Sequence, residues 1–305
     1  MRAVPSKKTK EEGDGGKGKY RGAKAKFHNP VVKLLLAGTR DPASPLFALN
    51  RFQKTLLPII WRQVDEWNKE HVVCFAPTAK KVRVVRDWPK VDTLSPASVN
   101  MLPLSRYDVA NTLPKDLHRF LPLVDMCLAM VDEAAEVVYL TVQESYVEEG
   151  ETQRRPGLHI ESPGTVLVSE LGTRRSSGWG GGQLTTVLKG GIFVASSVAD
   201  TCAIFANTEV VGAGEGSVVG EGGSCEHLRA YFKEQPVALR ANEVVWMTDR
   251  TPHEAMPQKS KGWRTFFRLV VGEVGVWYAQ HNTANPLCPL PDYVVVTHGN
   301  KFESM

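Results

Sequence analysis

Two residues in the segment 154–161 carry side chains that can bind a metal ion, His159 and Glu161, and they stand two positions apart. The segment is predicted to form a short strand at 157–160. Residues i and i+2 of a strand point to the same face, so the imidazole and the carboxylate can converge on one cation. Such a pair also occurs in ordinary structure, so a further ligand is needed to define a metal site.

The third candidate ligand is His253, which follows a predicted apolar strand at 243–247 and a turn. This order resembles the descending strand that delivers the distal metal-binding histidine in double-stranded β-helix proteins. Two histidines and one carboxylate occupy one face of ferrous iron, whereas structural zinc normally takes four protein ligands. His159, Glu161 and His253 are therefore the predicted metal ligands and catalytic residues. Asp249 is an alternative acid to Glu161, although its position is typical of a turn-forming residue.

Two arginines follow His253 after eleven and fifteen residues, Arg264 and Arg268. They lie four apart on a strand predicted at 264–272 and therefore share a face. The order of HxE, histidine and strand arginine resembles the 2-oxoglutarate oxygenase superfamily over residues 137–296.

The resemblance implies that Fe(II) is bound and that 2-oxoglutarate chelates the iron. It also implies that an arginine pairs with the distal carboxylate of the co-substrate, through the fork that a guanidinium offers. Arg268, deeper in the apolar run, is the predicted anchor, and Arg264 is its substitute or a substrate contact. By resemblance the reaction is a hydroxylation or an oxidative demethylation, coupled to decarboxylation of 2-oxoglutarate to succinate. The chain departs from the family pattern in having Glu161 where Asp is commoner, and in the long interval between His159 and His253.

Three further residues are predicted to line the substrate opening, Arg154, Arg155 and Trp179, because they flank the metal-binding segment or lie in a neighbouring loop. Two Gly-rich stretches, 172–191 and 212–223, are predicted to be long loops at a barrel mouth.

The elements that position these residues predict an α+β fold that is mainly β, a double-stranded β-helix (jelly roll) with N-terminal helices packed on one sheet. Apolar residues at spacings of three and four predict helical structure at 45–71, with either a kink at Pro58 or two shorter helices, and a helix at 114–135. From 136 onward, short apolar runs separated by glycine-rich turns predict strands. The remaining expected strands are 137–146, 165–168, 191–197, 202–207, 274–279 and 293–297.

Composition predicts an intracellular protein, cytoplasmic or nuclear, with no membrane partner. The chain of 305 residues has no secretory signal, no apolar run of membrane-spanning length and five scattered cysteines without a CxxC pair. Residues 1–26 hold nine Lys or Arg and three acidic residues, which gives this segment a net charge of +6. The whole chain has a net charge of +4, so the positive charge is concentrated in this segment. This segment is predicted to be a disordered basic tail, with nucleic-acid contact as the alternative. Residues 27–305 are predicted to form one catalytic domain, with helical support at 45–135 and a jelly-roll core at 136–298.

Two other hypotheses stay open. One is a cupin-type metalloenzyme with the same three ligands and no 2-oxoglutarate, and the other is a non-catalytic jelly-roll binding module. The substrate is unidentified at this stage, and a small molecule, a protein side chain and a nucleobase all remain open.

Overall fold

The computed structural model describes residues 71–74, 77–162, 164–167, 174–177, 179–211 and 218–298, together with Arg62, Glu66 and Lys69. The chain divides into two compact units, Met1–Trp67 and Asn68–Met305. The predicted tail at 1–26 and most of the predicted helix at 45–71 lie outside the described residues. The second unit is mainly β, as predicted, and most of its strand pairs are antiparallel.

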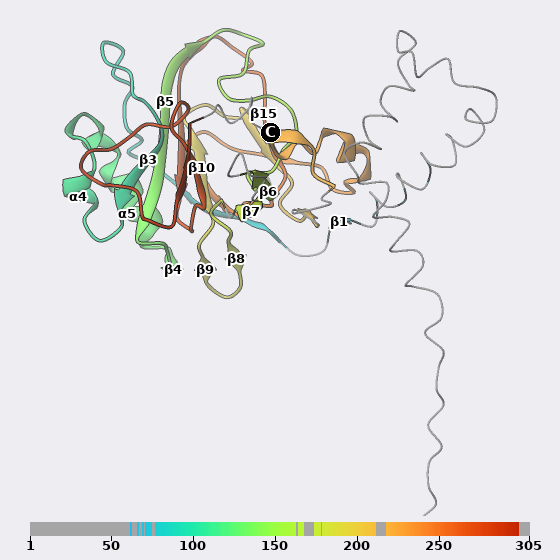
Figure 1. Ribbon diagram of the computed structural model, residues 1–305. Coiled ribbons are helices and arrows are strands. Elements are labelled where there is room, and N and C mark those ends of the chain that lie inside the picture. Colours follow the sequence, from blue (N-terminus) through green and yellow to red (C-terminus); the bar gives the residue numbers. More distant parts are fainter. Residues whose placement is uncertain are drawn as a thin grey trace, which may run out of the picture. The chain divides into compact units, whose positions relative to one another are not determined.

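An antiparallel sheet of six strands forms the centre of the second unit (Figure 1). Its strands, in spatial order, are β2 (Ala79–Val84), β14 (Glu243–Met247), β10 (Ile192–Ser196), β16 (Gly262–Val270), β5 (Val137–Val147) and β3 (Ser98–Ser105). The four inner strands are rich in β-branched and aromatic residues, which favour a pleated and buried surface. Their positions confirm the strands predicted from the sequence. Because side chains alternate along each strand, each face of the sheet carries its own apolar set.

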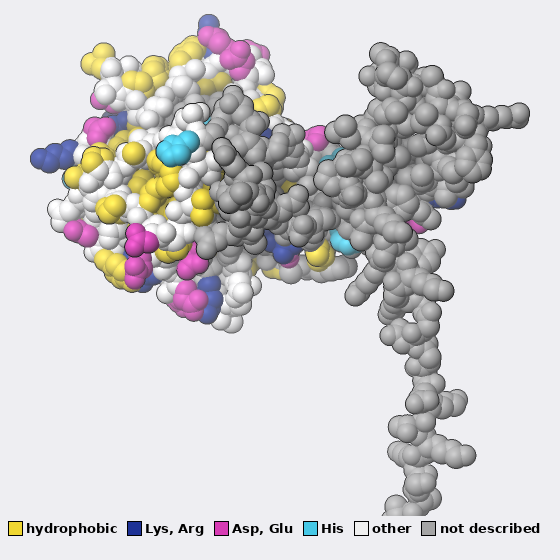
Figure 2. Space-filling model, in the orientation of Figure 1, with side chains coloured by type: hydrophobic (Ala, Val, Ile, Leu, Met, Phe, Trp, Pro, Cys, Tyr) yellow, Lys and Arg dark blue, Asp and Glu magenta, His cyan; other side chains and the backbone are white. Residues whose placement is uncertain are grey.

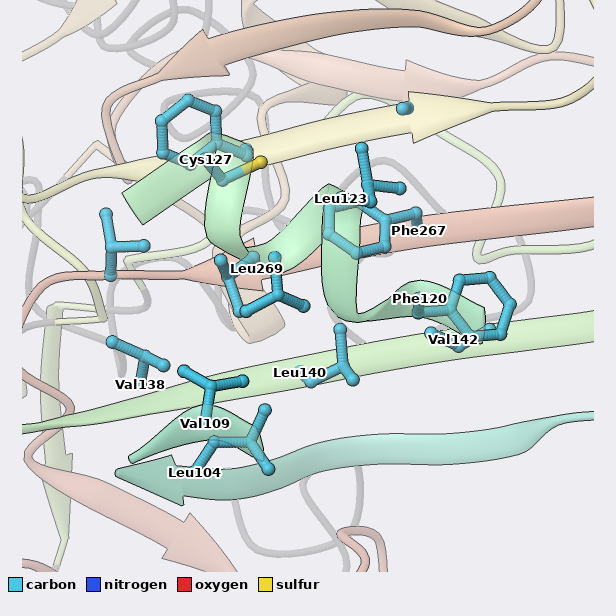
Figure 3. Close-up of a cluster of buried hydrophobic side chains, with 14 of the residues drawn as sticks. Leu104, Val109, Phe120, Leu123, Cys127, Val138, Leu140, Val142, Phe267 and Leu269 are labelled. Atoms are coloured by element: carbon cyan, nitrogen blue, oxygen red, sulfur yellow. The ribbon is translucent and has the colours of Figure 1, made fainter. Parts of the chain in front are cut away.

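Short helices cover one face of this sheet. They are α4 (Val109–Thr112), the 3-10 helix η2 (Lys115–Phe120) and α5 (Leu121–Leu128). Figure 3 shows the buried cluster in which Phe120 and Leu123 from the helices lie with Leu140 and Phe267 from the sheet. This packing agrees with the predicted helical layer on one sheet.

The single helix predicted at 114–135 is wrong in extent. Pro122 lies in the first turn of α5, where backbone N–H groups make no hydrogen bond within the helix. A proline, which lacks this N–H, is therefore tolerated there and marks the start of a helix. The segment after α5 forms a strand, β4 (Val131–Glu133).

A smaller sheet packs against the other face of the central sheet, in the order β13 (Val237–Ala238), β11 (Cys202–Ile204) and β15 (His253–Ala255). Cys202 and Ile204 of β11 belong to the same buried cluster as Val194, Val245 and Phe266 of the central sheet. Two sheets therefore face each other across an apolar interior, with the helices behind the larger one. In Figure 1, β15 and the helices α4 and α5 lie on opposite sides of the central sheet.

Smaller pairings complete the described part. They are β1 (Val72–Val73) with β12 (Glu209–Val210), β6 (Gly164–Leu167) with β7 (Arg174–Ser177), β17 (Val276–Tyr278) with β18 (Val295–Thr297), and β8 (Gln183–Leu184) and β4 with β9 (Leu188–Lys189). Two further 3-10 helices are η3 (Glu221–Gly223) and η4 (Glu226–Tyr231).

Three sequence predictions about these elements are wrong. No strand was predicted before 137, yet β2 and β3 form both edges of the central sheet. The strand predicted at 157–160 is a set of isolated bridges, at Pro156 and His159. The Gly-rich stretch 172–191 is not one long loop, because β7, β8 and β9 fall within it.

None of the helices in the described residues is both long and apolar enough to cross a membrane. The five cysteines are free thiols, and four of them are buried. On the face seen in Figure 2, acidic and basic side chains lie close to one another along the rim of the described part.

Candidate functional site

A cavity of about 70 Å³ lies between the two facing sheets and the segment 154–161. All eight residues singled out from the sequence line it: Arg154, Arg155, His159, Glu161, Trp179, His253, Arg264 and Arg268. Strand β16 contributes alternate residues, so Phe266 faces the cavity between the two arginines. The structure therefore brings together residues that are up to 114 positions apart in the chain.

The two histidines lie side by side at one end of the smaller sheet. Their backbones exchange two hydrogen bonds, from His159 N to His253 O at 3.0 Å and from His253 N to His159 O at 2.9 Å. The ring centroids are 4.6 Å apart. Nε2 of His253 lies 3.8 Å from Oε1 of Glu161.

The hydrogen bonds of the two rings leave Nε2 as the basic nitrogen in each. Nδ1 of His159 lies 2.7 Å from the carbonyl of Gly157, and Nδ1 of His253 lies 3.0 Å from the carbonyl of Thr251. A carbonyl oxygen only accepts, so each Nδ1 donates its proton and each neutral ring keeps its lone pair on Nε2. Histidine ligands of metals are commonly oriented in this way, by a carbonyl that accepts from the other nitrogen.

Burial keeps the first of these rings neutral. Desolvation, followed by the neighbouring His253, lowers the pKa of His159 to about 3. His159 is therefore uncharged near neutral pH, and an uncharged imidazole is the form that binds a metal.

The carboxylate of the cluster is turned toward an arginine. Glu161 and Arg268 are both buried and form an ion pair between Oε1 and Nη1. Within the described residues, no three His, Cys, Asp or Glu side chains are already grouped as metal ligands. The donor set of two imidazole nitrogens and one carboxylate nevertheless fits ferrous iron. For Glu161 to become a ligand, its carboxylate must move from Arg268 toward the histidines.

Arg268, the anchor preferred from the sequence, is thus paired with a protein carboxylate. Its Nη2 also lies 3.3 Å from Oγ1 of Thr141, and its guanidinium stacks 5.1 Å from the ring of Trp179. Only Nε has no hydrogen-bond partner among the described residues.

Arg264 is in a different situation. It is 1% exposed, and within the described residues no carboxylate pairs with it. Its Nε donates to Oγ of Ser196 at 3.0 Å and Nη2 to the carbonyl of Thr201 at 3.4 Å, while Nη1 has no partner there. Desolvation lowers the pKa of Arg264 to about 10. A buried guanidinium with a spare donor at a cavity wall is suited to an anionic ligand.

The predicted substrate contacts surround these groups. Arg154 donates to Oε1 of Gln143 at 2.8 Å and lies 4.9 Å from the centroid of the Phe266 ring. Desolvation and the nearby charge of Arg268 lower the pKa of Arg154 to about 10. Arg155 donates to the carbonyl of Gly222 at 2.6 Å.

Asp249, the alternative acid, is not among the residues that line the cavity. Its Oδ2 accepts from the backbone nitrogen of Trp179 at 3.3 Å, and burial raises its pKa to about 6. Asp249 therefore holds the segment that carries Trp179.

The segment that carries His159 is fixed from the side of η3 and η4. Ile160 N donates to the carbonyl of Gly223 at 2.9 Å. Gly223 has φ +82°, and a Cβ there would lie 2.3 Å from the carbonyl oxygen of Ile160, so only glycine fits. Leu158 N donates to Oε2 of Glu226 at 2.9 Å.

One arginine joins this segment to the strand that carries His253. Arg229 forms hydrogen bonds of 2.7 to 2.9 Å with both oxygens of Glu226 and both oxygens of Glu254. Since Glu226 holds Leu158 and Glu254 follows His253, this double fork connects the backbones that carry both histidines.

Other cavity residues were not found from the sequence. They are Asn100, Val194, Thr201, Cys202, Ala255, Phe266 and His281. Phe266 follows from the alternation of β16 between two arginines, but the others come from separate strands and loops with no shared pattern.

No protein-family model matches the chain, and no curated protein matches it. Solved structures of HygX from Streptomyces hygroscopicus are similar to it. The structure with iron bound is 13% identical, with a TM-score of 0.35, over 63% of this chain and 82% of that chain. The structure with nickel and 2-oxoglutarate bound is 12% identical, with a TM-score of 0.33, over 60% of this chain and 79% of that chain.

Proposed function

We propose that this protein is an Fe(II)- and 2-oxoglutarate-dependent oxygenase built on a jelly-roll barrel. One observation carries the proposal. Two histidines, both with Nε2 as the basic nitrogen, lie beside a buried carboxylate in a cavity that also holds a buried arginine without a carboxylate partner.

His159, Glu161 and His253 are the proposed metal ligands. The carbonyls of Gly157 and Thr251 orient the two rings and hold a proton on each Nδ1. Glu161 would bind the metal instead of Arg268, and its Oε1 lies 3.8 Å from Nε2 of His253, another proposed ligand. Bound iron would supply oxygen activation and oxidation of the substrate, coupled to the decarboxylation of 2-oxoglutarate to succinate.

Arg264 is the proposed anchor of the distal carboxylate of 2-oxoglutarate. Arg268 was the first choice from the sequence, but a protein carboxylate already meets it. Arg264 has a spare donor, Nη1, and is held by Ser196 and Thr201. A guanidinium that is oriented before the ligand arrives loses little entropy on binding, which favours affinity.

Two facing sheets support the proposed barrel. In a jelly roll, antiparallel strands form two sheets whose inner side chains enclose the site. The central sheet and the sheet of β11, β13 and β15 face each other in this way, with the metal cluster at one end of β15 and the arginines on β16.

The test is metal and co-substrate binding, followed by succinate release. We expect one Fe(II) per chain, and 2-oxoglutarate binding that needs both the metal and Arg264. The iron-loaded protein should release succinate from 2-oxoglutarate, slowly without substrate, and His159→Ala and His253→Ala should abolish this release. Metal binding without 2-oxoglutarate binding would favour the cupin-type enzyme instead. A protein that binds neither would refute both metalloenzyme hypotheses.

A further inference from the structure

The cavity holds more positive charge than the proposed function uses. Arg154, Arg155, Arg264 and Arg268 line it, and Glu161 is the one carboxylate among the lining residues that the structure describes. If iron and 2-oxoglutarate bind as proposed, the two positive charges of the metal and the one of Arg264 balance the two negative charges of 2-oxoglutarate and the one of Glu161. Arg154 and Arg268 are then left without counter-charge. Arg268 is buried, and a buried cation without a counter-charge is costly, so a further anion is expected beside it and its neighbour Arg154.

Arg268 is the stronger part of this argument. Its side chain is 7% exposed, so bulk water cannot solvate it fully if Glu161 turns away to a metal. Trp179 supports one face of the guanidinium, and Nε has no partner among the described residues. The edge of the guanidinium that now meets a carboxylate oxygen of Glu161 would be free to meet another carboxylate.

Arg154 reaches the same part of the cavity from the metal-binding segment. Its guanidinium rests over Phe266, which stands between Arg264 and Arg268 on strand β16. One of its amino groups is bonded to Gln143. The rings of Phe266 and Trp179 therefore each support one guanidinium group of the cavity lining, and a guanidinium binds a carboxylate by forked hydrogen bonds.

We propose that Arg154 and Arg268 form a second anion site, and that the substrate of this enzyme is a small molecule with a carboxylate group that binds there. The inference rests on the proposed function and narrows it. Of the three substrate classes that the sequence leaves open, a nucleobase has no such charge. The cavity has a volume of only about 70 Å³, and this size favours a small molecule as the substrate.

The pairing of Arg268 with Glu161 also couples the two ligands. Metal binding takes Glu161 away from Arg268 and so prepares the anion site. By thermodynamic reciprocity, the carboxylate should then tighten metal binding by the same factor.

The first experiment uses the protein loaded with Zn²⁺, a redox-inert metal, and saturated with 2-oxoglutarate, so that the Arg264 position is filled. Propionate, its neutral analogue propionamide, and inorganic phosphate are titrated by ligand-observed NMR. We expect propionate to bind at least tenfold more tightly than propionamide. Arg154→Gln and Arg268→Gln should each lower propionate affinity at least tenfold, while Arg83→Gln, on the exposed edge strand β2, should leave it unchanged. Equal affinity for propionate and propionamide would overturn the inference, and tighter binding of phosphate would overturn the carboxylate class.

The second experiment needs no metal and separates this inference from the proposed function. Glu161→Gln removes the carboxylate that pairs with Arg268, so the metal-free variant should bind propionate more tightly than the metal-free wild type. The double variant Glu161→Gln with Arg268→Gln should lose this gain, and because it removes both charges of the pair it leaves neither charge unbalanced. If Zn²⁺ and 2-oxoglutarate fail to bind but Glu161→Gln still gains affinity, the proposed function fails and the anion site stands. No gain in the Glu161→Gln variant would overturn the anion site.

Discussion

Arg264→Met should make the protein more stable while it removes 2-oxoglutarate binding. The structure gives the reason. Both groups that accept hydrogen bonds from Arg264 have other donors: Oγ of Ser196 accepts from Val198 N at 3.2 Å, and the carbonyl of Thr201 accepts from Met256 N at 3.0 Å. Removing the guanidinium therefore leaves neither acceptor unsatisfied, and methionine refills most of the apolar space.

The magnitude follows from the charge. Burial lowers the pKa of Arg264 to about 10, from an ordinary arginine value of about 12.5. At about 1.4 kcal/mol per pH unit, this corresponds to roughly 3 kcal/mol lost by keeping the guanidinium charged in the folded protein. Part of that cost is offset by the two hydrogen bonds, so we expect a net gain of about 1 to 3 kcal/mol in the variant. A gain of this size raises the thermal midpoint by about 2 to 4 °C per kcal/mol.

The pH dependence of stability tests the sign of this change in the free energy of unfolding. The folded protein holds the Arg264 proton less tightly than the unfolded chain, so the penalty is complete below pH 10 and declines above it. The advantage of Arg264→Met should therefore be constant between pH 6 and 9 and should narrow above pH 10. Urea unfolding at several pH values measures this, and calorimetry with Zn²⁺ present measures 2-oxoglutarate affinity. That affinity should fall by about 3 kcal/mol, or more than a hundredfold.

A matched control lies four residues along the same face of β16. Arg268→Met would leave the buried Glu161 without its arginine, which costs about 3 to 5 kcal/mol. The two substitutions should therefore change stability in opposite directions. If Arg264→Met instead destabilises the protein by more than about 2 kcal/mol, or leaves 2-oxoglutarate affinity unchanged, Arg264 is a structural residue and the reasoning above is wrong.

Three further predictions follow from other parts of the chain. Arg229→Met should lower Zn²⁺ affinity about tenfold, because the double fork to Glu226 and Glu254 links the two histidine-bearing segments. Competition with a chelating dye measures this, Arg229→Lys should retain part of the affinity, and unchanged binding would remove the positioning role. The pKa of His159 is lowered to about 3, so the folded state resists its protonation and stability should fall by about 2 kcal/mol between pH 7 and pH 5. In urea unfolding, His159→Gln should lose less stability than the wild type between pH 7 and pH 5, by the amount that His159 contributes. An identical loss in both proteins would show that protonation of His159 is not the cause. Deleting residues 1–26 should leave the thermal midpoint nearly unchanged, because they hold few apolar residues to bury, and a fall of several degrees would show that they pack on the body.

The inner strands of the central sheet were predictable, and the edge strands were not. β5, β10, β14 and β16 are mostly buried on both faces and are rich in apolar and β-branched residues, although two arginines interrupt the pattern in β16. β2 is rich in Lys and Arg, and β3 contains Pro103, both of which speak against a strand in a local pattern. Edge strands tolerate these residues because one side of their backbone has no partner strand.

The candidate site was predictable as a set of residues but not as a set of contacts. The sequence predicted that His159, Glu161, His253 and the two arginines would share one site, and they line one cavity although residues 157–160 form no strand. Which arginine has a protein partner depends on how the segment after His159 lies over β16, more than 100 residues further along the chain. No local pattern encodes that arrangement, and so the preference for Arg268 over Arg264 could not be tested from the sequence.

The two edge strands have a consequence for self-association. Lys80, Lys81 and Arg83 are exposed along β2, so a second copy of this edge would meet like charges. On β3, Pro103 lacks a backbone donor, and the pairing shifts register between Val99 and Leu102, which bends the strand. Both edges therefore resist the addition of another strand, and the central sheet is protected from growing into an aggregate when the protein is concentrated.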